Sequence, residues 1–474
     1  MRWSYLLFPI AALTACNKSD PPAPDPVVPP PVVVHVSSVT TSSSTSLMLS
    51  LDSTYRVSTV VSPANSTNPK LSYASSAVSI LKVDSTGLLT GVGLGVATVT
   101  VASVDNPQLS ITIQVAVVKN YAVYAAGYGP SQLALLWMTD SSYVELQPGT
   151  GGGSSNAASM VMVGSDLYVG GTSLNNEGWN IATWWKNGVV GEVSDPTIDY
   201  NNNVTAIGVS GTSIYLAGYD QWSLSNPSWA PAYINHAMWN ASYYSINGNA
   251  TTRNLVEPDT NEISSIIYAM AVSGTDVYLA GGFQPENATR IATYWKNDMN
   301  GAVALASGGD WSEAEGIAVQ GADVYITGYD ECPNYGCIPT VKLWKNNEQA
   351  VVNLTNGAVN AFSSCLAVND TAQYIGGYQQ TASGVKQAML WRVNGTVVTG
   401  IPLSDGVTDA AINGIAISGN DVFLAGYQID ASTNYQVATY WRVFGGIVSA
   451  PVKFRAGGYF GVSGNFVINA IVVK

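Results

Sequence analysis

Short stretches of alternating apolar and polar residues follow one another along almost the whole chain after residue 36. Examples are Ala97-Thr-Val-Thr-Val101, Val277-Tyr-Leu-Ala-Gly281 and Ile291-Ala-Thr-Tyr-Trp295. This period of two is typical of strands with one buried face. Glycine, asparagine, serine or proline separates the stretches, and none sustains the 3.6-residue period of an amphipathic helix. The pattern therefore predicts an all-β protein.

From residue 119 onward these strands form a repeat. A strand ending in Ala-Gly or Gly-Gly is followed by a strand ending in tryptophan, and two further short strands complete the unit. The tryptophans recur at intervals of roughly 50 residues, at Trp137, Trp185, Trp239, Trp295, Trp344, Trp391 and Trp441. Four strands repeated seven times predict a seven-bladed β-propeller over residues 119–474, with a linear β-solenoid as the weaker alternative.

The register of the repeat predicts how the ring closes. The first repeat begins at Tyr121 without an inner strand, and a spare inner strand, 468–473, ends the chain. We expect this strand to pair into the first blade and so to remove the open edges.

Two residue types recur, the tryptophan in all seven copies and an aspartate in four of them. We expect the tryptophans to form contacts between blades rather than a stacking platform for ligands. Aspartates recur in Ser-Gly-x-Asp turns, and we expect them to make hydrogen-bonded turns rather than a metal-binding ring. These aspartates are Asp166, Asp276, Asp323 and Asp421.

Residues 36–118 predict a separate small β-sandwich, because short β-branched strands and turns fill about 80 residues. Val83-Asp-Ser-Thr-Gly-Leu-Leu-Thr-Gly91 and Gly95-Val-Ala-Thr-Val-Thr-Val101 resemble the bacterial Ig-like domain, group 2. One departure is Tyr73, where that family often has tryptophan. The resemblance implies a spacer or adhesive module of a surface protein, and we expect a passive stalk.

The N-terminus carries an export pattern. A basic start and a short apolar run indicate a secretory signal over residues 1–15, since spanning a bilayer requires roughly 20 apolar residues. Leu13-Thr-Ala-Cys16 resembles a bacterial lipobox, which implies lipidation of Cys16. The alternative is an ordinary signal peptide with an incidental cysteine. Proline-rich residues 16–35 predict a semi-rigid linker.

These features predict a cell-envelope location: an outer-membrane lipoprotein exposed at the cell surface, which touches the membrane through its lipid alone. Charged residues make up only 10% of the chain and the net charge is −13. Because 18 basic residues spread over 474 form no basic stripe, nucleic acid is excluded as a partner. We expect a monomer that binds an extracellular glycan or protein.

Three cysteines follow Cys16. Cys332 and Cys337 flank a predicted loop and are a candidate disulfide in an oxidising compartment, with free thiols or metal binding as alternatives. Cys365 falls on a predicted inner strand, where we expect a small buried core residue.

Candidate ligand-binding residues lie in the variable loops of one propeller face. The longest insertion contributes Trp222, Trp229 and Tyr233, and another loop contributes Trp311. Their aromatic rings would stack on sugars or anchor a protein, whereas the alternative is a local mini-core. Acidic loop residues are a weak candidate for calcium, because no regular Asp-x-Asp-x-Asp loop supports them, and we expect no cofactor. These acids are Asp195, Asp199, Asp259, Glu262, Asp310, Glu313, Asp330 and Glu331.

The chain offers little for catalysis. It has two histidines, and His236 is the only base on offer for a Ser-His-Asp site. We assign no catalytic residue and expect a binding or adhesion module, not an enzyme. The alternative is a polysaccharide hydrolase or lyase that uses two loop carboxylates facing each other across the axial mouth.

Overall fold

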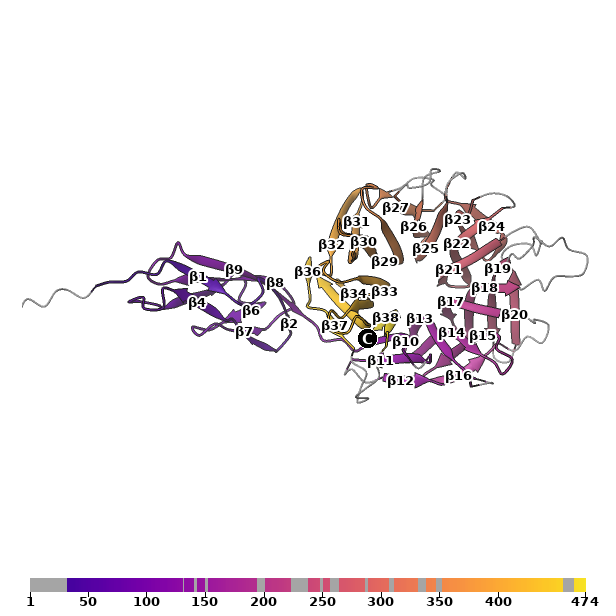
Figure 1. Cartoon of the computed structure of the whole chain (residues 1–474), viewed down its shortest axis with the longest axis horizontal. Helices are drawn as coiled ribbons and strands as arrows, with labels where there is room; N and C mark the ends of the chain where they lie inside the picture. The colour runs from indigo at the N-terminus through magenta and orange to yellow at the C-terminus, as the bar shows by residue number, and fades with distance from the viewer. Residues whose placement is uncertain are drawn as a thin grey trace, which may run out of the picture.

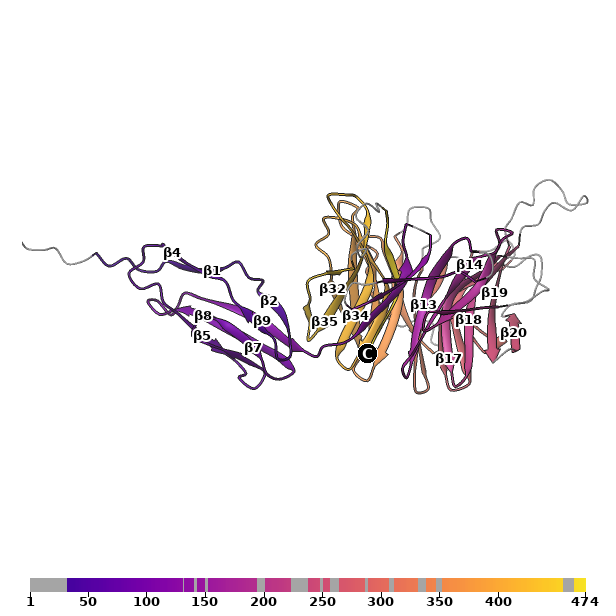
Figure 2. The same cartoon turned by 90° about the horizontal axis from the view of Figure 1, so that it is seen from below.

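The computed structural model describes residues 32–474 apart from several segments. The segments outside the description are 131, 140–142, 150–151, 194–200, 223–237, 248–249, 256–263, 286–288, 307–310, 331–337, 347–351 and 455–463. All regular structure in the described part is β-strand, in an elongated N-terminal unit followed by a ring of sheets (Figures 1 and 2). The predicted all-β fold is confirmed. Across this same part of the chain, no helix meets the length and apolarity required to cross a membrane.

The N-terminal unit is a sandwich around a core of aliphatic side chains. Its larger sheet contains β2 (Ser46–Ser50), β9 (Ser110–Val118), β8 (Gly95–Ser103) and β5 (Leu71–Ser75), in that order. Facing strands are β3 (Thr54–Arg56), β7 (Leu88–Gly91) and β6 (Leu81–Val83), with β1 (Ser38–Thr41) paired to β4 (Thr59–Ser62). Alternate residues of β8 and β9, such as Val99 and Ile113, are fully buried. Tyr73 packs its ring over Gly87, where a Cβ would lie 2.8 Å from the ring.

The second unit consists of seven sheets in its described residues, each with four strands or, in the last, five. From the axis outward, the first sheet contains β38 (Val467–Val473), β10 (Val123–Tyr128), β11 (Ala134–Met138) and β12 (Tyr143–Leu146). The second contains β13 (Ser155–Val163), β14 (Asp166–Leu174), β15 (Asn180–Lys186) and β16 (Val189–Glu192). The third contains β17 (Asn201–Ser210), β18 (Ser213–Trp222), β19 (Met238–Asn247) and β20 (Ala250–Leu255).

The remaining four sheets follow the same order. The fourth contains β21 (Ser264–Ser273), β22 (Asp276–Gln284), β23 (Ile291–Lys296) and β24 (Asp298–Ala304), and the fifth contains β25 (Ser312–Gln320), β26 (Asp323–Asp330), β27 (Thr340–Lys345) and β28 (Val352–Asn353). The sixth contains β29 (Ala361–Asn369), β30 (Ala372–Gln380), β31 (Lys386–Asn394) and β32 (Val397–Pro402). The seventh contains β33 (Ala410–Ser418), β34 (Asp421–Ile429), β35 (Gln436–Phe444), β36 (Ile447–Val448) and β37 (Val452–Lys453).

The sheets stand around a common axis, and their innermost strands contact one another in turn (Figure 1). The order is β13, β17, β21, β25, β29, β33 and β38, and β38 also contacts β13. The C-terminal strand β38 pairs antiparallel with β10 of the first repeat, for example Val123 with Val473. The first sheet thus combines strands from both ends of the propeller sequence.

Six of the seven predicted tryptophans are buried between blades, as expected. Trp185, for example, has no exposed surface, packs against Leu136 of the preceding sheet and donates from Nε1 to the carbonyl of Gln147 at 2.8 Å. Burying each such ring removes on the order of 150–250 Å² from water. The other five are Trp137, Trp295, Trp344, Trp391 and Trp441.

The placement of Trp239 in this set is wrong. In the third sheet Tyr244 pairs with Leu216, as Trp295 pairs with Leu279 in the fourth sheet, so Tyr244 occupies the position of the repeated tryptophan. Trp239 instead pairs with Gln221, nearer the loop. Tyr244 is buried in the contact with the second sheet. The sequence signal was the turn, since Tyr244-Ser-Ile-Asn-Gly248 matches Trp391-Arg-Val-Asn-Gly395.

One glycine recurs within the second strand of every repeat, and the backbone requires it. Each inner strand has a β-bulge, which brings a carbonyl oxygen against that glycine. A Cβ on Gly281 would lie 1.9 Å from the oxygen of Ile266, and a Cβ on Gly377 would lie 2.0 Å from that of Phe362. No side chain fits at such a separation. The same holds at Gly127, Gly171, Gly218, Gly328 and Gly426.

The recurring aspartates accept hydrogen bonds from side chains of the next turn along the blade, whereas a hydrogen bond within their own turn was expected. Asp276 accepts hydrogen bonds from Asn297 Nδ2 at 3.1 Å and from Lys296 Nζ at 2.7 Å, and the Lys296 ammonium lies 5.1 Å from the ring centre of Tyr278. Asn297 adopts a φ of 65° and accepts from the backbone N–H of Val277. The equivalent groups around Asp166 and Asp323 repeat this arrangement, so three of the seven blades share it.

The last blade differs at this turn and contacts the sandwich. Arg442 replaces lysine, and it binds Asp421 through Nε at 2.7 Å and the carbonyl of Lys119 through Nη2 at 2.8 Å. Beside it, Ile447 and Phe444 pack against a small apolar surface of β2 and β9. The planar guanidinium can serve both partners at once, which a single ammonium does less well.

Candidate functional site

Seven residues, one from each inner strand, occupy the β-bulges around the axis; we call them the bulge ring. They are Ala158, Thr205, Tyr268, Glu315, Ser364, Asn413 and Asn469. Four of them hydrogen-bond to a backbone carbonyl of the next blade. Thr205 binds Ile267 at 2.7 Å, and Asn469 Nδ2 binds Ala157 at 2.8 Å. The ring therefore joins neighbouring blades at the axis.

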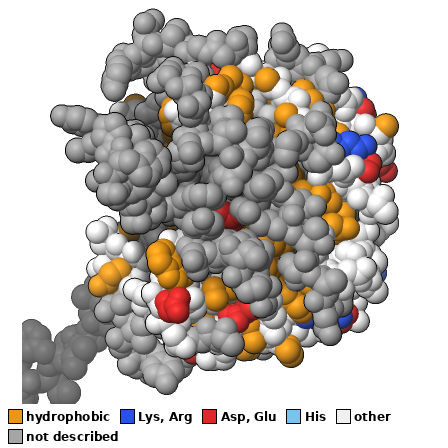
Figure 3. Space-filling model, turned by 90° about the vertical axis from the view of Figure 1, so that its right-hand side faces the viewer, with side chains coloured by type: hydrophobic (Ala, Val, Ile, Leu, Met, Phe, Trp, Pro, Cys, Tyr) orange, Lys and Arg blue, Asp and Glu red, His pale blue; other side chains and the backbone are white. Residues whose placement is uncertain are grey.

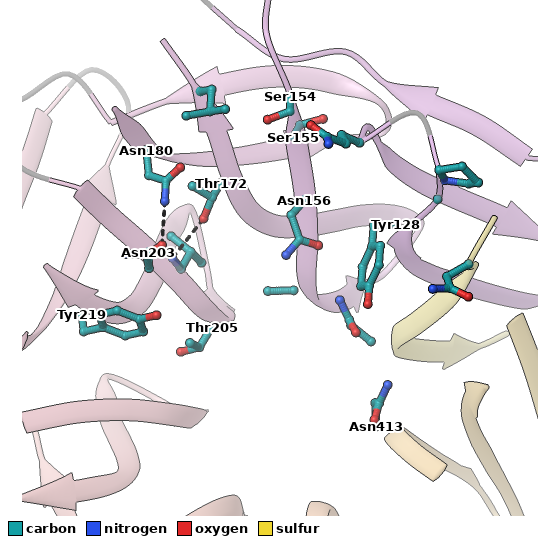
Figure 4. A pocket seen from close by; sticks show the side chains of 18 of the residues that line it. Tyr128, Ser154, Ser155, Asn156, Thr172, Asn180, Asn203, Thr205, Tyr219 and Asn413 are labelled. Atoms are coloured by element: carbon teal, nitrogen blue, oxygen red, sulfur yellow. Dashed lines mark hydrogen bonds between the residues drawn. The ribbon is translucent and has the colours of Figure 1, made fainter. Parts of the chain in front are cut away.

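A cavity of about 830 Å³ lies above part of this ring, at the end of the propeller where the loops vary (Figure 4). Its walls come from the first four sheets and the last, because strand ends from each converge there. The side chains that line it include seven amides, four hydroxyls and three tyrosines. These are Gln132, Asn156, Asn180, Asn203, Asn413, Asn465, Asn469, Ser154, Ser155, Thr172, Thr205, Tyr128, Tyr219 and Tyr268.

Several of these amides are held in place by one hydrogen bond each. Asn180 donates through Nδ2 to Asn203 Oδ1 at 2.8 Å, and Figure 4 shows the two side chains together on one wall. Asn413 Nδ2 donates to the carbonyl of Ile468 at 2.9 Å. An amide carries two N–H donors and two acceptor lone pairs, so one structural bond orients the group and leaves further capacity toward the cavity.

Tyrosines follow the repeat glycine in five of the seven second strands, at Tyr128, Tyr219, Tyr329, Tyr378 and Tyr427. Burial raises the pKa of Tyr128 and of Tyr219. Both phenols are therefore neutral at physiological pH. They offer a flat apolar ring together with a hydroxyl, and the cavity wall includes one of them from the first blade and one from the third.

The fourth and fifth blades depart from the repeat and hold a buried ion pair. Arg290 Nη1 lies 2.9 Å from Glu313 Oε1, and the two side chains are only 6% and 8% exposed. Tyr268 and Tyr329 donate their hydroxyls to the same carboxylate at 3.0 Å and 2.9 Å. Glycine at position 282, where five of the other six blades have tyrosine, makes room, since a Cβ there would lie 2.4 Å from Arg290 Cδ.

Trp311 is the one predicted aromatic ligand whose side chain is described. Its ring is 37% exposed and lies 5.1 Å from the guanidinium carbon of Arg290, so it covers the buried ion pair. It does not line the 830 Å³ cavity. Trp222 ends β18, where its backbone pairs with Met238. Trp229 and Tyr233 lie outside the described residues.

The acidic candidates for calcium are likewise only partly described. Glu313 is engaged by Arg290, and Asp330 pairs with Lys342. The other six lie outside the described residues, as do Cys16, Cys332 and Cys337. Within the described ranges, no group of three or more histidine, cysteine, aspartate or glutamate side chains is arranged to hold a metal ion. Cys365 is buried and free, and burial raises its pKa to about 12.

Sequence reasoning missed the residues that line the cavity. Asn413 and Asn469 lie within mostly apolar inner strands, where a single polar residue does not stand out from the alternation of apolar and polar positions. The signal was available: aligned on the repeat, both fall at the position of Thr205 and Ser364, which is polar in every inner strand except that of Ala158. Which blades bring those positions together could not be read from the repeat.

Figure 3 shows the side of the propeller that faces away from the sandwich. Among the described residues on that side, acidic and basic side chains are scattered between apolar and neutral polar ones, with no patch of one charge. The neutral lining of the cavity is therefore in keeping with the sparse charge of this surface.

The fold and site define the chain as a β-propeller protein that carries an Ig-like domain. Residues 35–113 match the bacterial Ig-like domain (group 2) family, which confirms the expected likeness for that segment. No curated protein matches the chain.

Solved structures similar to the chain are propellers. One is the β-propeller domain of the trilobed protease from Pyrococcus furiosus, at 10% identity and a TM-score of 0.33, covering 72% of this chain and 96% of that one. Trypanosoma rangeli sialidase in complex with sialic acid has 9% identity and a TM-score of 0.38, with 65% and 56% covered. The tricorn protease has 9% identity and a TM-score of 0.39, with 80% and 38% covered.

These matches correct one expectation. We expected a protein that is not an enzyme, but the similar solved structures include a sialidase and two proteases. That expectation, which rested on the two histidines and on the lack of a marked pair of carboxylates, is contradicted by these matches. At these identities the matches show the fold alone, and the chemistry must be argued from the cavity.

Proposed function

We propose that the propeller binds a glycan in the 830 Å³ cavity. We also propose that the protein is a lipoprotein, whose lipid anchor holds the propeller at the bacterial cell surface. The observation that carries the proposal is the composition of the cavity wall, in which amides, hydroxyls and tyrosines converge from five blades. Volumes of roughly 300–1,000 Å³ are typical of small-ligand sites, so the cavity has room for a short saccharide.

Amides suit sugars because each sugar hydroxyl is both a donor and an acceptor, as each amide is. Held amides such as Asn180 and Asn413 present these groups without a further loss of side-chain freedom on binding. The rings of Tyr128 and Tyr219 supply apolar faces for the C–H face of a sugar, while their neutral hydroxyls add polar contacts.

Titration calorimetry of residues 37–474 against a panel of oligosaccharides tests this proposal. The informative variant is Tyr128→Ala/Asn156→Ala, which removes one ring and one exposed amide from the wall. We expect at least about tenfold weaker binding. A matched control, Asn394→Ala/Tyr435→Ala, removes the same groups at exposed positions outside the cavity and should bind normally. Equal binding by both variants would refute the site.

The same samples test whether a bound glycan is processed. Mass spectrometry of the oligosaccharides after incubation distinguishes retention of an intact ligand from cleavage by a hydrolase or lyase. Cleavage would establish an enzyme that uses this cavity, and intact ligand together with binding would support a recognition module.

Anchoring is tested separately at Cys16. We expect labelled palmitate to be incorporated into the full chain when it is expressed in a bacterium, and to be lost in a Cys16→Ser variant. Protease treatment of intact cells then reports whether the propeller is displayed outside, since a shielded propeller would survive it.

A further inference from the structure

Glu315 is the one carboxyl group in the bulge ring. The ring lies between the large cavity and a smaller one of about 270 Å³ further along the axis. Ala158, Thr205, Tyr268, Asn413 and Asn469 line both cavities, whereas Glu315 and Ser364 line the smaller one. The carboxyl therefore lines the smaller cavity, which shares these five lining residues with the proposed glycan site.

The side chains that face Glu315 from neighbouring strands are neutral or already neutralised. Its closest carboxylate neighbour, Glu313, is paired with Arg290. Tyr268 of β21, Tyr329 of β26 and Tyr378 of β30 interact electrostatically with it, and the pKa of each phenol is raised. Cys365 of β29 lines the same smaller cavity, and burial raises the pKa of its thiol.

A carboxyl group in this position has no cation to balance it. Among the described residues that line either cavity there is no lysine or arginine. Burial, with Glu313 adding to it, raises the pKa of Glu315 to about 8. The group is thus mostly protonated at neutral pH. Glu315 is the only acidic side chain of the bulge ring, so a positively charged ligand group that enters the ring would pair with it.

We propose that Glu315 receives a primary ammonium group of the ligand, so that the preferred glycan carries an unacetylated amino sugar. This rests on the proposed function, because the amides and tyrosines of the larger cavity would hold the neutral part of the saccharide. Ion pairing ionises the carboxyl: the Glu315 O–H bond breaks, its proton passes to solvent, and the carboxylate contacts the ligand ammonium.

The test compares a glucosamine tetramer with its fully N-acetylated form by titration calorimetry at pH 6.5. We expect the glucosamine tetramer to bind about tenfold more tightly than the acetylated one. Glu315→Gln should abolish that preference, so that the two tetramers bind the variant with equal affinity. Glu145→Gln, the same change on the exposed outer strand β12, is the matched control and should keep the preference.

A second readout needs no variant. Repeating the titration in two buffers of different ionisation enthalpy measures proton release, and we expect release with the glucosamine tetramer and none with the acetylated tetramer. Equal affinity for both tetramers, or no proton release, would overturn the role of Glu315 while leaving glycan binding intact. Failure of every oligosaccharide of the panel, these two included, to bind would overturn both proposals.

Discussion

The two ends of the propeller ring follow opposite rules. At the end with short turns, the same aspartate, lysine and asparagine recur in three blades, where Asp166, Asp276 and Asp323 make the same contacts. At the other end each blade contributes something different, from the amides of the third blade to the buried Arg290–Glu313 pair. Repetition marks what builds a blade, and departure from it marks where the molecule is specialised.

Among the features that recur in every blade, the largest effect on stability is expected from adding one methyl group at the recurring glycine. Gly377→Ala should destabilise the propeller by more than about 4 kcal/mol, because the new Cβ would lie 2.0 Å from a carbonyl oxygen. Urea denaturation monitored by tryptophan fluorescence measures it. Gly400→Ala is the control, since its Cβ would meet only ordinary contacts from 3.5 Å outward, and it should change stability by less than about 0.5 kcal/mol.

The next largest effect belongs to the specialised end. Arg290→Met leaves Glu313 buried without its cation and should cost about 3 kcal/mol in the free energy of unfolding. Adding Glu313→Gln in the same chain should restore part of the loss, because the uncompensated charge is then gone. A double variant that is no more stable than Arg290→Met would show that packing, not charge, makes this cluster stable.

A pH dependence sharpens the comparison further. The folded-state pKa of Glu315 is raised from 4.5 to about 8, so its contribution to stability is fully present below pH 4.5 and is lost as pH rises through about 8. The urea midpoint of the wild type should therefore fall between pH 5 and 8. Glu315→Gln should flatten this part of the profile. An unchanged slope in the variant would assign the dependence to other groups.

The smallest effect is expected from a single contact at the end with short turns. Lys296 and Asp276 are 45% and 35% exposed, so water and salt screen their attraction. Asp276→Asn should shift the melting temperature little and leave oligosaccharide binding unchanged. Its partner Lys296 holds the pKa of Asp276 below its usual range, so the stability that the carboxylate contributes is lost only as the pH falls into the acid range. Scanning calorimetry at pH 7 and pH 3 checks both statements.

The contrast between repeated and specialised residues also explains how much of the structure could be predicted from the sequence. The all-β fold, the Ig-like segment and six buried tryptophans were evident because each rests on a pattern that recurs or is local. Trp239 was misplaced because it lies only five residues before Tyr244, so spacing alone could not separate them, whereas the turn sequence could. The cavity depends on which blades meet at its mouth, and that information is absent from any one repeat.

Individual residues show the same limit. Arg290 looked like an ordinary loop residue, and its burial depends on the glycine at 282 and on the carboxylate of the next blade. Glu315 looked like one more polar residue in a strand, and its raised pKa depends on a bulge that turns it toward the axis. Both effects arise from contacts between repeats.

The pairing of β38 with β10 also sets the order of events when the chain is made. Val467–Val473, which are made after every other strand of the propeller, supply the innermost strand of the first blade. Until they arrive, the blade at the start of the ring lacks the strand that contacts its neighbours on both sides. The propeller is thus a structure whose first part is finished last, so a truncated product would carry an unfilled edge that marks it as incomplete.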